Sequence, residues 1–231
     1  MQSAQDNKAQ TALPAAHSSG ERRAATLALL TIAGIFLYVI IDVIAQLLPP
    51  HYNPIKQAES DLAVGPYGFV MTINFVLRGL LSLALLWALV LGVAMQGLSR
   101  PGLILLGAWG VGAIVLALFP TDLAGAAPTF HGKIHLQVAT LAFICAAVGE
   151  LLLSLKFAND EQSRSLRRPA LVIATLVIFA ALLVLALPFA PKLASDFGLY
   201  ERIFIGLVLL WMLVIAFRLR SLPGSNNPLR M

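Results

Sequence analysis

Long apolar runs without charge alternation constrain this chain more than any other feature. They cover about Ala24 to Leu48, Tyr67 to Met95, Pro101 to Phe119, Gly132 to Phe157 and Pro169 to Phe189, with a sixth at about Leu199 to Phe217. Each reaches the roughly 17 to 25 residues that a helix needs to cross a hydrocarbon core of about 30 Å. They are rich in Leu, Ala and Val and do not alternate between apolar and polar residues, as the strands of a membrane barrel do. The sequence therefore predicts an all-α polytopic membrane protein, with six transmembrane helices in one bundle.

The composition agrees with a membrane location and defines the domain limits. The chain has 231 residues, of which 59% are hydrophobic and 12% charged, and a soluble surface of this size needs more charge. Residues 1–20 are rich in Ala, Gln and Ser, and residues 221–231 contain a Pro-Gly-Ser-Asn-Asn run. We expect a disordered N-terminal tail, a transmembrane domain over residues 21–220 and a flexible C-terminal tail.

Basic residues near the spans predict the orientation in the membrane, because Lys and Arg are enriched on the cytoplasmic side. With a cytoplasmic N-terminus, the inner side receives ten of them: Arg22, Arg23, Arg100, Lys156, Arg164, Arg167, Arg168, Arg218, Arg220 and Arg230. The outer side receives Lys56, Lys133, Lys192 and Arg202. Both termini are predicted to be cytoplasmic, in the inner (plasma) membrane. This topology and anionic headgroups explain the net charge of +5, so the partner we expect is the lipid bilayer and not nucleic acid.

Polar side chains gather at the helix ends that this topology places outside. The first outer connection contains Glu59, Ser60 and Asp61, and the second contains Asp122, His131 and, one turn into the fourth span, His135. The third connection leads into Glu201 and Arg202. We therefore expect a functional site that faces outward, in which Glu59, Asp61 or Asp122 performs acid–base chemistry and Ser60, Glu201 and Arg202 form the rim.

His131 and His135 have the spacing of two residues on one helical face, near enough for both imidazoles to bind one metal ion or to share a proton. An acid such as Asp122, Glu59 or Asp61 would supply an oxygen ligand or a supporting hydrogen bond. This pattern suggests zinc or another divalent metal as a cofactor. The alternative is a pair of interfacial histidines bonded to carbonyl groups or to lipid headgroups.

A second group of polar residues lies inside the apolar runs: Asp42 in the first, and Asn74 and Arg78 in the second. A charge near the bilayer centre costs about 2.5 to 3.5 kcal/mol on insertion scales, so it usually faces the bundle interior and has a partner. Side chains lean toward the helix N-terminus, which narrows the difference in depth between Asp42 and Arg78. We predict an ion pair between these two, supported by Asn74, that serves either packing or function.

The string Gln57-Ala-Glu59-Ser60-Asp61, with Asn74 and Arg78-Gly79 after it, is followed by Phe119-Pro-Thr-Asp122 and by His131-Gly-Lys-Ile-His135. Together these motifs resemble the bacterial and archaeal membrane proteins of the domain of unknown function 998 family. The resemblance extends over nearly the whole chain and implies a six-span inner-membrane protein, without an established reaction.

A more distant comparison is with membrane hydrolases that include the alkaline ceramidases and progestin-type receptors. Their zinc site uses histidines, an aspartate and a serine at a membrane face, and Ser60, Asp61, His131 and His135 resemble that set. Those proteins typically have seven spans, with the paired histidines in the last, whereas the pair here opens the fourth of six. The resemblance implies only that a metal-activated water could attack an amide or ester near the headgroups.

Three hypotheses about function remain open at this point. The first is a membrane enzyme, with or without a metal, that acts on a lipid or amphiphile at the outer interface. The second is a transporter of a small solute or ion, and the third is a sensor or partner protein without catalytic activity. The residues in the outward site favour the first or third, and the intramembrane group favours the second.

Overall fold

The computed structural model describes residues 19–50, 52–159 and 163–221, and these residues contain helices and no strand. The long helices are α1 (Ser19–Leu47), α2 (Gly68–Gly92), α3 (Arg100–Leu116), α4 (Phe130–Lys156), α5 (Arg167–Ala186) and α7 (Phe197–Arg220). Between them lie the short helix α6 (Pro191–Ala194) and the 3-10 turns η1 (Glu59–Ala63), η2 (Met95–Gly97), η3 (Phe157–Asn159), η4 (Arg164–Leu166) and η5 (Leu187–Phe189). The predicted tails fall almost entirely outside the described residues.

Five of these helices are long and apolar enough to cross a membrane: α1, α2, α4 with η3, η4 with α5 and η5, and α7. The sixth apolar run forms α3, which has 17 residues. The chain is therefore a multi-pass helical membrane protein, as the apolar runs predict. Helix α3 ends at Leu116 and not near Phe119, so it is shorter than the sequence pattern suggests.

The starts of α3 and α4 follow from residues that satisfy free backbone N–H groups. The side chain of Ser99 accepts a hydrogen bond from the Gly102 N–H, and Pro101 occupies the first turn of α3. In the same way, Thr129 accepts a hydrogen bond from the Gly132 N–H at the start of α4. These caps hold the two helix ends in place next to the connections that contain polar residues.

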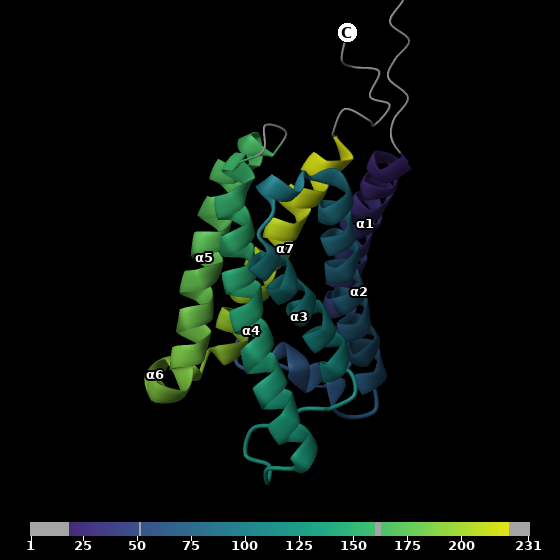
Figure 1. Ribbon diagram of the computed structural model, residues 1–231. Helices are drawn as coiled ribbons and strands as arrows, with labels where there is room; N and C mark the ends of the chain where they lie inside the picture. The colour runs from purple at the N-terminus through teal and green to yellow at the C-terminus, as the bar shows by residue number, and fades with distance from the viewer. Residues whose placement is uncertain (1–18, 51, 160–162, 222–231) are drawn as a thin grey trace, which may run out of the picture.

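The six long helices run along a common direction and form one bundle (Figure 1). The start of α1 and the end of α7 lie at the same end of the bundle, which we call the termini end. The α2–α3 and α4–α5 connections lie there too. Turn η1, the α3–α4 connection and α6 lie at the opposite end, which we call the η1 end (Figure 1). The three predicted outer connections are thus brought to one end.

The bundle interior is packed by large aromatic side chains and by close helix contacts. The rings of Trp109 and Phe204 meet edge to face, with their centres 6.4 Å apart, and the ring centres of Phe143 and Phe204 lie 4.5 Å apart. Helices α2 and α3 approach closely, since a Cβ added at Gly79 would lie 2.5 Å from the Gly110 carbonyl oxygen. Small residues that permit such contacts are typical of helix pairs in membranes. The outer faces of the helices are lined by exposed apolar side chains, as lipid contact requires.

Candidate functional site

A buried polar cluster lies where η1 meets α1 and α2. The Nη1 atom of Arg78 lies 3.1 Å from Oε2 of Glu59 and 3.2 Å from the hydroxyl of Tyr38. The Tyr38 hydroxyl in turn donates to Oε1 of Glu59. Asn74, one turn before Arg78, donates to the Tyr38 carbonyl at 3.2 Å. We call these four residues, Tyr38, Glu59, Asn74 and Arg78, the Arg78 cluster.

Aromatic rings surround the guanidinium of Arg78. Its central carbon lies 4.9 Å from the ring centre of Trp109, 5.2 Å from that of Phe75 and 5.9 Å from that of Tyr38. Such cation–π contacts partly replace the water that a buried charge loses. Because Glu59 is only 3% exposed, the cluster is a closed ion pair and not an open channel for water.

The predicted pair between Asp42 and Arg78 is wrong. Arg78 pairs with Glu59, and Asp42 instead accepts a hydrogen bond from Gln46 at 2.6 Å, one turn along α1. Asn74 contacts α1 through the Tyr38 carbonyl and does not bridge two charges. The prediction treated the segment with Glu59 as a surface loop, whereas η1 folds inward between the helices and brings its acid to the arginine. Tyr38 was missed because nothing distinguishes it within its apolar run.

The residues at the start of α7 hold the 52–58 loop, which leads into η1. The Nη1 atom of Arg202 donates to the carbonyls of Pro54 at 2.8 Å and Gln57 at 3.0 Å, and its Nη2 contacts the Tyr52 hydroxyl. Gly198 is needed there, because an added Cβ would lie 2.1 Å from the Gln57 carbonyl oxygen. Burial raises the pKa of the Tyr52 hydroxyl, so this group remains a neutral partner.

Glu201 connects the same helix to η1 itself. Its Oε2 accepts a hydrogen bond of 2.6 Å from the backbone N–H of Glu59. Both Glu59 and Glu201 are buried. Turn η1 is therefore held on one side by Arg78 of α2 and on the other by Glu201 of α7, which places Ser60 and Asp61 between them and the surface.

Asp122 occupies the N-terminal end of α4. Its carboxylate accepts hydrogen bonds of 2.8 Å from both the backbone N–H and the hydroxyl of Thr129. The same carboxylate sits against Gly132, where an added Cβ would lie 2.0 Å from it. The two hydrogen bonds from Thr129 lower the pKa of Asp122. An ionised acid at a helix N-terminus is favourable, so Asp122 anchors the α3–α4 connection to α4.

The two histidines lie in different surroundings. His135 is 4% exposed, and its Nδ1 lies 2.6 Å from the Phe119 carbonyl oxygen. Because a carbonyl can only accept, Nδ1 carries the proton, and Nε2 of the neutral ring is left as an acceptor. His131 is exposed, and its ring centre lies 5.5 Å from that of Phe119 and 6.0 Å from that of Phe130.

Metal binding by these histidines is not supported. In the described part of the chain, no group of three or more His, Cys, Asp or Glu side chains is arranged to hold a metal ion. One of the acids expected as a ligand, Asp122, is already bonded to Thr129. The Glu59 carboxylate is bonded to Arg78 and Tyr38. The predicted ligands that remain, His131, His135 and Asp61, are not gathered into the set of three protein ligands that a catalytic zinc usually has.

A pocket of about 590 Å³ opens at the η1 end beside these residues. Its polar lining consists of Lys56, Ser60, Asp61, Thr121, Asp122, His135, Thr140 and Glu201, and its apolar lining of Ala58, Ala124, Leu136, Ala139, Phe143, Val184, Leu185, Pro188, Ala194 and Phe197. Burial raises the pKa of Asp61 in this setting. Five predicted site residues thus line one cavity: Ser60, Asp61, Asp122, His135 and Glu201.

Comparison with known proteins places the chain in a family. No curated protein and no solved structure matches it. The sequence model of one family matches residues 32–218, which include every long helix in whole or in large part. The family is described as a protein of unknown function, DUF998, in agreement with the resemblance of the Glu-Ser-Asp and His-Gly-x-x-His motifs. The chain, itself a multi-pass membrane protein, belongs to the DUF998 family.

Proposed function

We propose that this protein binds an amphiphile in the pocket at the η1 end, which the basic residues of the connections predict to be the outer face of the inner membrane. One observation carries the proposal: a single cavity joins polar groups from η1 and α7 to an apolar wall on α4 and α5. Ligand pockets are typically apolar with a few converging polar groups. A headgroup would meet the polar end, and an acyl chain would follow the wall.

The dimensions of the wall suit part of an acyl chain. On α4 it extends from Leu136 to Phe143, which is about 10 Å along the helix axis at 1.5 Å per residue. Val184 and Leu185 face it from α5. Ser60 and Glu201 offer a hydroxyl and a carboxyl group at the polar end. A headgroup with hydrogen-bond donors, such as an alcohol, amide or ammonium group, fits this lining best.

The binding test uses detergent-purified protein with monoolein and oleylamine as probes, which present hydroxyl groups and an ammonium group, respectively. A ligand at 100 times its Kd stabilises the folded state by about 2.7 kcal/mol, and we expect one of the two probes to raise the unfolding temperature accordingly. Thr140→Phe fills the apolar wall and should abolish the increase. Thr175→Phe is the matched control, since Thr175 is exposed on α5 outside the pocket, and should leave it unchanged. An equal increase in the Thr140→Phe variant would place binding elsewhere.

A second candidate function, hydrolysis of the bound amphiphile, is favoured by the way His135 is held. With Nδ1 donating to Phe119, Nε2 can take the proton of a water that attacks an ester or amide carbonyl. The new C–O bond to water replaces the bond to the leaving group, and the leaving group receives the proton from Nε2. Glu59, one of the three acids predicted for acid–base chemistry, has one carboxylate oxygen bonded to Tyr38 and the other to Arg78.

The hydrolysis candidate predicts that His135→Gln lowers turnover of a fluorogenic acyl ester by about 10²-fold or more while Thr140→Phe prevents binding. We expect activity to persist in a chelator. Zinc or another divalent metal remains the alternative, and elemental analysis of the wild type beside the His131→Ala and His135→Ala double variant decides it. A stoichiometric metal that is lost in the double variant would assign the metal-dependent form.

Binding without turnover would instead select a sensor, whose outer connections report occupancy to a partner. Transport is the less supported alternative, because the intramembrane residues Arg78 and Glu59 are bonded to each other and buried. Solute uptake into liposomes that survives Thr140→Phe would favour transport over the amphiphile pocket.

A further inference from the structure

A separate groove is lined by residues of α1 and α2. These residues belong to the first turns of α1 and the last turns of α2, which lie at the termini end of the bundle, far from η1 (Figure 1). It has a volume of about 450 Å³ and is lined by Arg22, Arg23, Thr26 and Leu27 of α1 and by Trp87 and Leu91 of α2. Its lining contains two basic residues and no acid. The groove has no part in the function proposed above.

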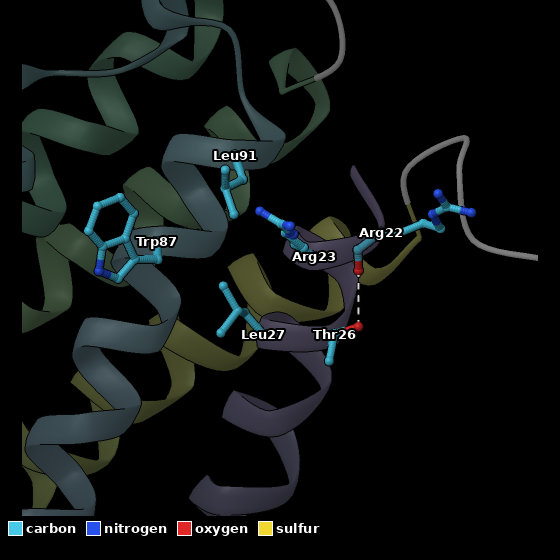
Figure 2. Close-up of a pocket in the computed structure, with 6 residues that line it drawn as sticks. All are labelled: Arg22, Arg23, Thr26, Leu27, Trp87 and Leu91. Atoms are coloured by element: carbon cyan, nitrogen blue, oxygen red, sulfur yellow. Dashed lines mark hydrogen bonds between the residues drawn. The ribbon is translucent and has the colours of Figure 1, made fainter. Parts of the chain in front are cut away.

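The side chains of the groove divide into a charged end and an apolar floor. Figure 2 shows the Arg23 guanidinium extended toward Leu91 of α2, with Leu27 and Trp87 further along the groove, whereas Arg22 points away from it. The Thr26 hydroxyl donates to the Arg22 carbonyl at 3.0 Å, so its proton is used within α1. The charge available inside the groove is therefore that of Arg23.

The floor faces the surroundings of the bundle. Trp87 is 58% exposed and Leu91 is 37% exposed, and both helices that form the groove cross the membrane. Tryptophan is enriched where the hydrocarbon meets the headgroups. Arg23 lies one turn before Leu27, so the charge sits about 6 Å further toward the helix end at 1.5 Å per residue. This is the order in which a lipid presents its phosphate and its acyl chain.

We propose that an anionic phospholipid occupies this groove, with its phosphate at Arg23 and an acyl chain along Leu27, Trp87 and Leu91. The guanidinium fork matches a phosphate group, with which it can form two parallel hydrogen bonds. Basic pockets between transmembrane helices are known to hold anionic headgroups. A free phosphate would use only the charged end, whereas the apolar floor requires a chain attached to it.

The tryptophans of the chain provide a direct test. The sequence has three of them, of which Trp109 and Trp211 are fully buried while Trp87 is exposed. Brominated lipids quench tryptophan fluorescence on contact. The protein is reconstituted in vesicles of phosphatidylcholine and phosphatidylglycerol, with the bromine on one lipid or the other at equal mole fraction. We expect phosphatidylglycerol to be preferred about fivefold, the factor equivalent to about 1 kcal/mol for one basic residue at an anionic surface.

Two variants of equal charge separate a site from general attraction. Arg23→Gln should reduce the preference to about one, and Arg22→Gln, which removes the neighbouring charge that points away, should retain it. Trp87→Phe should remove the lipid-dependent part of the quenching and leave the signal of the two buried tryptophans.

Several results would overturn the proposal. One is equal quenching by both lipids in the wild type, and another is an equal loss in the Arg22→Gln and Arg23→Gln variants. Persistence of the preference after Trp87→Phe would place the lipid elsewhere. Competition by inorganic phosphate at constant ionic strength would assign the site to a free anion instead of a lipid.

Discussion

Arg78→Leu should destabilise the protein by about 3 to 5 kcal/mol, the range measured when one partner of a buried ion pair is removed. The substitution leaves the Glu59 carboxylate buried without a cation, beside the Tyr38 hydroxyl and the Asp42 side chain. It also removes the cation from between Phe75 and Trp109. Unfolding in mixed micelles with increasing sodium dodecyl sulfate measures the change. A loss below about 1 kcal/mol, the size of an exposed pair, would contradict the buried pairing.

A second substitution identifies the partner of Arg78. If Glu59 carries the charge that Arg78 neutralises, Glu59→Gln in the Arg78→Leu background should restore part of the stability, because no unpaired charge then remains buried. Asp42→Asn tests the pairing first expected. Asp42 bonds to Gln46 and interacts with Glu59, but it forms no ion pair with Arg78, so this substitution should restore less stability than Glu59→Gln. Recovery with Asp42→Asn and not with Glu59→Gln would revive the pairing first expected from the sequence.

Arg202→Leu should release the 52–58 loop from α7 and weaken amphiphile binding, because Lys56 and Ala58 of this loop line the pocket. The carbonyls of Pro54 and Gln57 and the Tyr52 hydroxyl lose their charged donor. Each group left unsatisfied in a partly buried position costs about 1 to 3 kcal/mol. Amide hydrogen exchange should become faster for Lys56 and Gln57, whose N–H groups bond within the loop, and the probe that stabilises the wild type should lose its effect.

The control for this experiment is Arg220→Leu, which removes an exposed arginine from the other end of α7. Arg202→Lys tests the geometry, because an ammonium group cannot reproduce the planar set of donors that reaches several carbonyls at once. We expect Arg202→Lys to speed up amide hydrogen exchange in the loop as much as Arg202→Leu does, although the lysine keeps the positive charge. Unchanged exchange in both Arg202 variants would mean that the loop is held by Gly198 packing and the Leu199 N–H bond to Ile55.

The helices were predictable because hydrocarbon thickness sets a minimum length for any apolar run that crosses it. The six runs correspond to the six long helices, and the largest difference concerns the third. It was expected to continue to Phe119, but the chain leaves the helix at Leu116, and the Phe119 carbonyl bonds instead to His135. This contact joins residues 16 positions apart in the sequence, and periodicity within the run does not reveal it.

The sequence predicted where the site lies but not which residues form its ion pair. Acids and histidines at alternate helix ends must share one end of a bundle with an even number of crossings, and Asp61, His135 and Glu201 do line one pocket. The partner of Arg78 depended on how far η1 enters the bundle, which helix depths cannot give. Tyr38, central to the cluster, has no sequence signal beyond being an aromatic residue in a span.

The limited length of α3 has a consequence for the surrounding bilayer. Its 17 residues rise only about 25 Å at 1.5 Å per residue, compared with a hydrocarbon layer of about 30 Å. Such hydrophobic mismatch is relieved when neighbouring acyl chains compress. The Thr121–Asp122 connection that follows α3 borders the amphiphile pocket, so we expect a locally thinned leaflet at its entrance. A molecule leaving that leaflet would then travel a shorter distance along the membrane normal to reach the cavity.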